Sequence, residues 1–321
     1  SLSSGGHLTH GYRMNISSKI FKSVSYHVDP VTEMLDYGQL AEQVKKEKPM
    51  LLIGGYSAYP RLINFAKLRE IADSVGAVLM GDIAHFSGLV AGGAITGDYH
   101  PVPYCDIVSS TSHKTLRGPR GGFVLCKNAY KESVDKGCPF VLGGPLPHVM
   151  AAKAVAFQEA IKPEFKTYAR QVIVNAKAMA DQFLKRKVKL FSGGTDNHLI
   201  VIDVATSFGL NGRQAEKALR EAFITANRNM IPFDKNGPWY TSGVRLGTAA
   251  MTTLGMKQQE MVIIANMITD ILIATKAGID VKTQAASQSL VHTEERALAQ
   301  SRGQVKELLE AFPLYPELVI E

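Results

Sequence analysis

A lysine follows a stretch of apolar and hydroxyl-bearing residues that has the composition of a buried strand. Residues 108–113 read Val-Ser-Ser-Thr-Ser-His and lead into Lys114, after which comes a turn rich in glycine and proline with two arginines. Burying an ammonium group is costly, and a desolvated lysine has a lowered pKa and becomes a nucleophile that can form a Schiff base. The alternative for Lys114 taken alone is a side chain that extends to the surface.

An acid lies at the end of a second apolar stretch. Residues 77–85 form this stretch and end in Asp-Ile-Ala-His, and Asp82 precedes Lys114 by enough chain for a loop and the next strand of a wound sheet. Ligands of open α/β sheets bind beyond the carboxyl ends of the strands, so the two side chains are expected to meet there. Pyridoxal phosphate (PLP) needs this pair: a lysine for its aldehyde and an acid that keeps its ring nitrogen protonated.

Five motifs in one order along the chain extend this pattern. They are Gly-Gly-His-Leu-Thr-His-Gly with His7, Gly-Gly-Tyr-Ser-Ala-Tyr with Ser57, Asp-Ile-Ala-His with Asp82 and His85, Thr-Ser-His-Lys-Thr-Leu-Arg-Gly-Pro-Arg-Gly-Gly with Lys114, and Thr-Ser-Gly-Val-Arg-Leu-Gly-Thr with Arg245. In these motifs and their order, the sequence resembles the serine hydroxymethyltransferase family from its first residues to beyond residue 250.

The resemblance implies an α/β fold, that of the fold-type I PLP-dependent transferases, with a mainly parallel sheet flanked by helices and a smaller C-terminal α+β domain. Residues 1–160 are expected to form the large PLP-binding domain, without its N-terminal part, and residues 161–321 the small domain. In the family, the residues before the His7 motif include a glutamate and tyrosines that enter the neighbouring subunit's active site. No stretch of this chain matches them, so we expect it to retain a cofactor site but to turn over substrate slowly.

The resemblance also assigns a role to each motif residue. Lys114 holds the cofactor aldehyde, Asp82 its ring nitrogen, and His7 stacks on its ring. Thr111 tunes the exchange of the lysine with the substrate amine, and together with His113 and Lys114 it forms the predicted catalytic set. The oxygens and the phosphate of the cofactor are assigned to Ser57, His85, His113, Arg120, Gly143 and Gly144; no metal ligand is predicted.

Arg245 lies in a short predicted strand, residues 242–246, in the second half of the chain. A guanidinium on a half-buried strand offers the fork that a carboxylate accepts through two hydrogen bonds. A structural ion pair is the alternative from the residues alone. The resemblance makes Arg245 the anchor for the carboxylate of the amino-acid substrate, with Ser57 and His85 as further substrate contacts.

Two positions depart from the family pattern. Leu142 replaces a glutamine before Gly143 and Gly144, in a loop that in the family reaches the cofactor phosphate of the partner subunit; the glycine amides still suit a phosphate, and a plain loop is the alternative. Phe233 stands where many members have an asparagine. It lies in residues 227–239, which border the folate pocket in the family, so the difference bears on folate affinity.

Composition narrows the class of protein. The chain has 321 residues, 45% of them hydrophobic and 20% charged, as in ordinary globular proteins, and no apolar run approaches the roughly 18 residues of a membrane span. The net charge of +7 suits anionic small molecules, because the basic clusters are too short and too poor in aromatics to predict nucleic-acid binding. Three cysteines without a CxxC pair predict no disulfide framework and favour a reducing cytoplasm.

Periodicity and turn residues predict an alternation of strands and helices. The expected strands are residues 50–53, 77–85, 108–113, 120–126, 197–204 and 242–246. The expected helices are residues 37–48, 62–75, 150–187 with an interruption at Pro163, 211–222, 257–276 and 293–312.

The predicted reaction is the PLP-dependent transfer of a hydroxymethyl group between serine and tetrahydrofolate, giving glycine and 5,10-methylenetetrahydrofolate. We expect a cytoplasmic homodimer with no nucleic-acid or membrane partner. Another fold-type I enzyme, such as a threonine aldolase or a glycine acyltransferase, shares the lysine, the acid and the arginine, but the His7 motif and residues 227–239 favour the hydroxymethyltransferase. The alternative from another class is a non-catalytic chain that binds protein partners or RNA.

Overall fold

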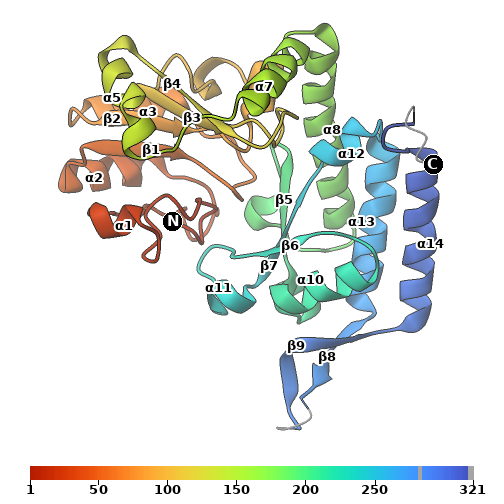
Figure 1. Ribbon diagram of the computed structural model, residues 1–321. Coiled ribbons are helices and arrows are strands. Elements are labelled where there is room, and N and C mark those ends of the chain that lie inside the picture. Colours follow the sequence, from red (N-terminus) through yellow and green to blue (C-terminus); the bar gives the residue numbers. More distant parts are fainter. Residues whose placement is uncertain (281–283, 317–321) are drawn as a thin grey trace. The chain divides into compact units, whose positions relative to one another are not determined.

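The computed structural model describes residues 1–280 and 284–316 (Figure 1). The chain divides into two compact units: the first contains Ser1–Ser57 and Leu62–Arg170, and the second contains Ala58–Arg61 and the chain from Gln171 onward. The four residues Ala58–Arg61 therefore belong to the second unit, although the residues on either side of them belong to the first. The predicted domain division at residues 160 and 161 stays a prediction.

The first unit is built on a four-stranded sheet in which three neighbouring strands are parallel and the fourth is antiparallel. This arrangement confirms the predicted mainly parallel sheet. At the carboxyl edge, Gly55 pairs with Asp82 and Asp82 with Ser109, so the three parallel strands end side by side. The strands, in sheet order, are β1 (Leu51–Gly55), β2 (Val78–Asp82), β3 (Ile107–Thr111) and β4 (Gly122–Cys126).

Side-chain caps determine where two helices of the first unit begin. The Asp36 carboxylate accepts the first free amides of α2, and the Asn64 side chain accepts the Lys67 amide, so that α3 begins at residue 65 rather than at the predicted 62. The longer helices that begin in this unit are α2 (Tyr37–Glu47), α3 (Phe65–Asp73), α7 (Pro147–Ala160) and α8 (Pro163–Lys185), which continues into the second unit. The short ones are α1 (Ser17–Ile20), α4 (Ser87–Ala91), α5 (Lys131–Asp135) and α6 (Gly137–Phe140).

Helix α3 lies directly against the sheet. Phe65 and Leu68 are fully buried on its inner face, and a Cβ at Gly54 of β1 would lie 2.5 Å from Leu68 Cδ1. A larger residue at position 54 would have to displace the buried Leu68 side chain, so glycine allows the helix to pack closely on the strand.

The second unit contains an antiparallel sheet, a hairpin and the remaining helices. Its sheet has the order β5-β7-β6, with β5 (Leu199–Asp203), β6 (Asn227–Asn229) and β7 (Gly243–Gly247). The hairpin pairs β8 (Thr275–Ile279) with β9 (Ala286–Thr293). The helices are α9 (Val204–Phe208), α10 (Gly212–Glu221), α11 (Gly237–Tyr240), α12 (Ala249–Thr253), α13 (Gln258–Ile273) and α14 (Glu295–Ala311).

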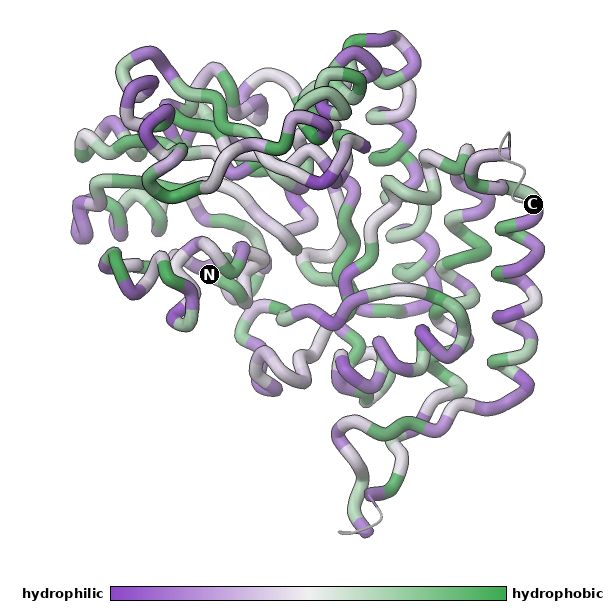
Figure 2. Tube along the Cα trace, in the orientation of Figure 1, coloured by the Kyte–Doolittle hydropathy of each residue, from purple (hydrophilic) through white to green (hydrophobic). Residues whose placement is uncertain are grey.

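The predicted capping box of the second unit is confirmed. The Asn211 side chain accepts the Gln214 amide and the Gln214 side chain accepts the Asn211 amide, which starts α10 at residue 212. The core beside it includes the fully buried Ile202 of β5 and Ile268 of α13. Figure 2 shows hydrophilic and hydrophobic residues in turn along α14, as on a helix with one buried face.

The predicted helix over residues 257–276 is too long. It ends at Ile273, and Thr275 begins the hairpin, with its hydroxyl 2.6 Å from the Ile271 carbonyl oxygen and 2.9 Å from the Thr293 hydroxyl. Sequence periodicity missed the change because the hairpin strands have little alternation of their own. No described helix has the length and apolar composition needed to cross a membrane.

The nearly buried carboxylate of Asp106 bonds three separate segments of the first unit. Asp106 accepts hydrogen bonds from Arg69 at 2.7 Å, from the Lys127 ammonium at 2.8 Å and from the Leu79 amide at 2.8 Å. Burial acts to raise the pKa of Asp106, but the bonds from Lys127, Leu79 and Arg69 outweigh it and lower this pKa to about 2.

We expect Asp106→Asn to destabilise the fold in a pH-dependent way. Because the folded-state pKa lies below the ordinary value of 3.8, the carboxylate stabilises the fold above that pH, and this contribution is lost as the pH falls toward 2. The variant should lose about 1.5–3 kcal/mol near neutral pH, the range for charged hydrogen bonds. Urea unfolding should show the difference from wild type shrinking in acid, whereas the exposed Asp98→Asn should match wild type throughout.

Candidate active site

The carboxyl edge of the parallel strands brings together most of the residues predicted for the cofactor. Asp82 is the last residue of β2 and Thr111 the last residue of β3. Ser57, His85 and Lys114 follow β1, β2 and β3 by two or three residues. This is the edge at which open α/β sheets bind ligands, and it lies wholly within the first unit.

Asp82 is held by a histidine to which the sequence analysis gave no role. His10 Nε2 lies 2.7 Å from Asp82 Oδ2, and the two side chains are only 15% and 17% exposed. The Ala84 amide donates to the other oxygen at 3.2 Å. Burial acts to raise the pKa of Asp82, but the hydrogen bond and charge of His10, the Ala84 amide and the charge of His7 together lower it. The carboxylate is therefore ionised at neutral pH.

His7 lies in the same N-terminal turn. Its Nδ1 is 2.7 Å from the Thr9 hydroxyl, and its ring centroid is 5.8 Å from that of His10. The turn is joined to the sheet edge because the Ser57 amide donates to the Gly5 carbonyl at 2.7 Å. The second histidine of the motif, three residues after the first, was the signal in the sequence that could have identified His10.

Lys114 lies in a turn rather than at the end of a strand. The predicted strand over residues 108–113 is wrong at its end, because β3 stops at Thr111 and the next residue, Ser112, turns the chain. The buried Ser112 hydroxyl donates to the Pro119 carbonyl at 2.6 Å, and the Gly118 amide donates to the Ser112 carbonyl at 2.7 Å. These bonds close the loop that presents the half-buried Lys114.

A threonine fixes this turn against the one that follows β2. The Thr115 hydroxyl donates to the His85 carbonyl at 2.9 Å and accepts from the Gly88 amide at 3.0 Å. A Cβ at Gly88 would lie 2.1 Å from the Thr115 carbonyl oxygen, so only glycine allows the two turns to approach. The turn that follows β2 and the turn that contains Lys114 are thus held in contact.

The remaining predicted cofactor residues lie further along the first unit. The ring of His113 accepts the Gly121 amide at 3.4 Å. Arg120 is exposed in the segment before β4. Gly143 and Gly144 lie in the exposed loop between α6 and α7, where a Cβ on either meets no described atom within 4 Å. The roles of these four residues at the phosphate stay predictions.

Arg245 is a half-buried residue in the middle of β7, in the second unit. It pairs with Val201 of β5 on one side and with Asn227 of β6 on the other, and its Nε donates to the Asn227 side-chain oxygen at 3.1 Å. Burial lowers the pKa of its guanidinium. Asn227 was not predicted to contact Arg245, because their pairing depends on a strand of only three residues.

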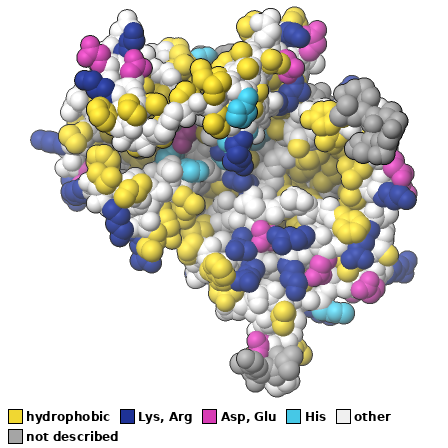
Figure 3. Space-filling view, in the orientation of Figure 1, with side chains coloured by type: hydrophobic (Ala, Val, Ile, Leu, Met, Phe, Trp, Pro, Cys, Tyr) yellow, Lys and Arg dark blue, Asp and Glu magenta, His cyan; other side chains and the backbone are white. Residues whose placement is uncertain are grey.

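Residues 227–240 contain more secondary structure than the predicted loop, namely β6 and α11. Phe233 is 55% exposed with a positive φ of 57°. Trp239 is 60% exposed, and the guanidinium carbons of Arg213 and Arg228 lie 5.1 and 5.5 Å from its ring centroid. Figure 3 shows basic side chains with acidic ones among them where α10 lies, and Arg228 is paired with Glu216 at 2.7 Å.

The residues of the first unit fit a PLP ring. A carboxylate has about four lone-pair positions, and the bonds from His10 and Ala84 use two of those on Asp82 among the described residues. Because the carboxylate is ionised, it can hold a protonated pyridine nitrogen. Lys114, in the turn fixed beside it, supplies the amine that the aldehyde requires.

Replacing Arg245 tests the predicted carboxylate anchor. Arg245→Lys keeps the charge but loses the two-pronged donor, so the affinity for serine and glycine should fall by about 1.5–3 kcal/mol. Titration of the PLP-loaded protein with glycine measures it. Unchanged glycine affinity with normal cofactor content would exclude the role.

Comparison with known proteins agrees with this geometry. A family model for serine hydroxymethyltransferase matches residues 1–268. The chain is similar to a serine hydroxymethyltransferase of Treponema pallidum (strain Nichols), with 57% identity over 98% of this chain and 54% of that protein. Those of Salinispora tropica and Chlamydia trachomatis serovar D are 54% and 50% identical, over 99% and 100% of this chain and 66% and 64% of their own lengths. The chain thus spans between half and two thirds of the length of these relatives, and it belongs to the serine hydroxymethyltransferase family.

Proposed function

We propose that this chain provides the cofactor- and amino-acid-binding parts of an enzyme that transfers a hydroxymethyl group between serine and tetrahydrofolate, giving glycine and 5,10-methylenetetrahydrofolate. The observation that carries the proposal is the ionised Asp82, held by His10 at the carboxyl edge of the sheet beside the Lys114 turn. Membership of the family supports the choice of substrates.

When bound, PLP supplies a ring that withdraws electrons from the Cα atom of an amino acid. Asp82 keeps a proton on the ring nitrogen, which strengthens that withdrawal, and His10 keeps Asp82 oriented and ionised. His7, in the same turn as His10, would stack on the ring. Lys114 Nζ would hold the cofactor aldehyde, and Thr111 and His113, on either side of Ser112, would shape the exchange of this amine with that of the substrate.

Arg245 binds the substrate carboxylate through its two-pronged guanidinium. Fixing the carboxylate orients the amino acid, so that the bond to be broken is aligned with the cofactor ring; orientation of this kind supplies a large share of an enzyme's rate. Ser57 and His85 contribute hydrogen bonds to the cofactor and the substrate. Arg213, whose guanidinium carbon lies 5.1 Å from the Trp239 ring centroid, suits the anionic part of a folate.

The finer assignments rest on the same reasoning. PLP and tetrahydrofolate are the cofactor and the co-substrate, and the active form is a homodimer in which Gly143 and Gly144 of one subunit reach the cofactor phosphate of the other. The three cysteines, all free, fit a reducing cytoplasm.

The experiment is to measure serine cleavage by the PLP-loaded protein with and without tetrahydrofolate. Acceleration by tetrahydrofolate supports the hydroxymethyltransferase. Cleavage of threonine with no response to tetrahydrofolate would identify an aldolase instead. No cofactor absorbance band at all would favour a chain that acts by binding alone.

A further inference from the structure

A short segment of the chain leaves the first unit immediately after Ser57. Ala58–Arg61 belongs to the second unit, whereas Ser57 and Leu62 on either side of it belong to the first. Ser57 follows β1 at the edge where Asp82 lies. Ala58, the first residue of this segment, is therefore joined by a peptide bond to Ser57, a residue of the proposed cofactor site.

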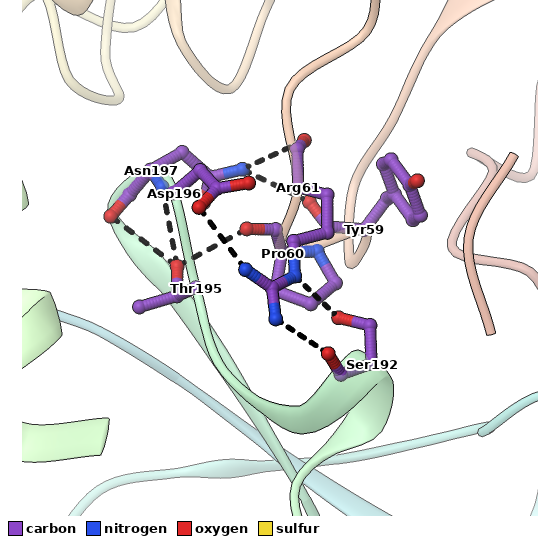
Figure 4. A network of polar contacts seen from close by, with 7 residues as sticks. All are labelled: Tyr59, Pro60, Arg61, Ser192, Thr195, Asp196 and Asn197. Atoms are coloured by element: carbon purple, nitrogen blue, oxygen red, sulfur yellow. Dashed lines mark hydrogen bonds and ion pairs between the residues drawn. The ribbon is translucent and has the colours of Figure 1, made fainter. Parts of the chain in front are cut away.

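The backbone of this segment is held by the loop that leads into β5 (Figure 4). The Pro60 carbonyl accepts the Asp196 amide at 2.8 Å and the Thr195 hydroxyl at 3.1 Å. The Asn197 side chain donates to the carbonyls of Tyr59 and Arg61 at 3.1 and 3.2 Å. Three successive carbonyl groups are thus bonded to three successive residues of one loop.

The Arg61 side chain adds charged bonds to the same loop. Its Nη1 lies 3.0 Å from Asp196 Oδ1, its Nε donates to the Ser192 hydroxyl at 3.0 Å, and its Nη2 donates to the Ser192 carbonyl. Ser192 has a φ of +56°, a conformation that residues with a Cβ rarely adopt. The guanidinium bonds the hydroxyl and the carbonyl of Ser192, so Arg61 supports this conformation of the loop.

The loop in turn determines where β5 begins. The Asn197 side-chain oxygen accepts the Leu199 amide at 2.8 Å, and the His198 carbonyl accepts the Thr248 amide at 3.1 Å. From there β5 pairs with β7 residue by residue, with Leu199 opposite Gly247 and Val201 opposite Arg245. A shift of the loop is therefore transmitted to the strand pair that holds Arg245.

We propose that Arg61 is a positioning residue of the amino-acid site: it fastens the segment after Ser57 to the loop of residues 192–197 and so fixes the β5–β7 pair that presents Arg245. The inference rests on the proposed function, because it takes Arg245 as the residue that binds the substrate carboxylate. Arg61 touches neither substrate nor cofactor; it acts through the loop.

The test compares Arg61→Ala with Arg186→Ala in the full 321-residue chain. Arg186 is the control, because it also bonds an aspartate and a second side chain in the second unit, but its partners, Asp270 at 2.7 Å and Asn266 at 3.3 Å, lie on α13 and not in the loop of residues 192–197. Arg61→Ala should raise the dissociation constant for glycine about tenfold or more in PLP-loaded protein, with PLP content unchanged. Arg186→Ala should leave glycine binding as in wild type even if its melting temperature falls equally.

Hydrogen exchange of the cofactor-free protein supplies a second readout. Arg61→Ala should accelerate exchange of the amides of β5 and β7, and Arg186→Ala should not. If Arg61→Ala does not fold, Asp196→Ala and Ser192→Ala remove one side-chain bond each and should give smaller changes in the same direction. Wild-type glycine affinity together with wild-type exchange in the Arg61 and Asp196 variants would overturn the inference. A wild-type chain that binds no PLP would instead refute the proposed function and leave the exchange result to decide on Arg61.

Discussion

Replacing Lys114 with alanine should abolish the covalent retention of PLP and nearly all activity. In the proposed function this amine bonds the cofactor aldehyde, and no guanidinium or hydroxyl can substitute for it. Lys114→Arg should fail as well, because a guanidinium remains protonated and is not nucleophilic. We expect a loss at least as large as the 10²- to 10⁴-fold typical of a positioned proton-transferring group.

The measurement is borohydride reduction of the PLP-loaded protein followed by peptide mapping. The label should appear on Lys114 in wild type and be absent from both variants. Lys153→Ala is the matched control, because Lys153 lies in the same unit but donates to the Gly122 carbonyl at 2.7 Å. A label on Lys153 or on any other lysine would show that the cofactor site has been assigned to the wrong turn.

Replacing Asp82 with asparagine should leave PLP bound while removing most of the activity. The amide has nearly the same shape as the carboxylate, but it cannot hold a proton on the ring nitrogen by charge. We expect a fall of about 10²- to 10⁴-fold. Because the pKa of Asp82 is lowered in the folded state, its charge is kept at every pH above the ordinary value of 3.8, so no acid limb from Asp82 should appear in the neutral range.

A variant of His10 separates the contribution of this histidine to activity from that of the Asp82 carboxylate. His10→Asn removes the bond to Oδ2 and the charge that lowers the pKa of Asp82. His10→Asn should reduce activity less than Asp82→Asn does. As the pH is lowered, the activity of His10→Asn should begin to fall at a higher pH than that of wild type, because the pKa of Asp82 is less lowered. Turnover in Asp82→Asn within a few-fold of wild type would rule out the proposed role of the acid.

The elements that surround the site could be predicted because their signals are local. Residues 77–85 and 108–113 are apolar runs closed by polar residues, and such runs become neighbouring parallel strands when helices separate them. The Asn211–Gln214 capping box depends on residues three apart. The short strand that bears Arg245 was also predicted, at residues 242–246, and is β7 in the structure. The sequence alone therefore determined the fold class and placed Asp82 and Lys114 at one edge.

The tertiary structure decided what holds these residues in place. His10 is 72 residues from Asp82, and Arg61 is 135 residues from Asp196, so neither bond has a signature in any window of the sequence. The predicted end of β3 was wrong because the Ser112 hydroxyl turns the chain by bonding the Pro119 carbonyl, a contact that strand periodicity does not register. Local propensity selects the elements, whereas hydrogen bonds between distant segments form only once the chain has folded. Those bonds orient Asp82, join the Lys114 turn to the one after β2 and hold the loop that leads into β5.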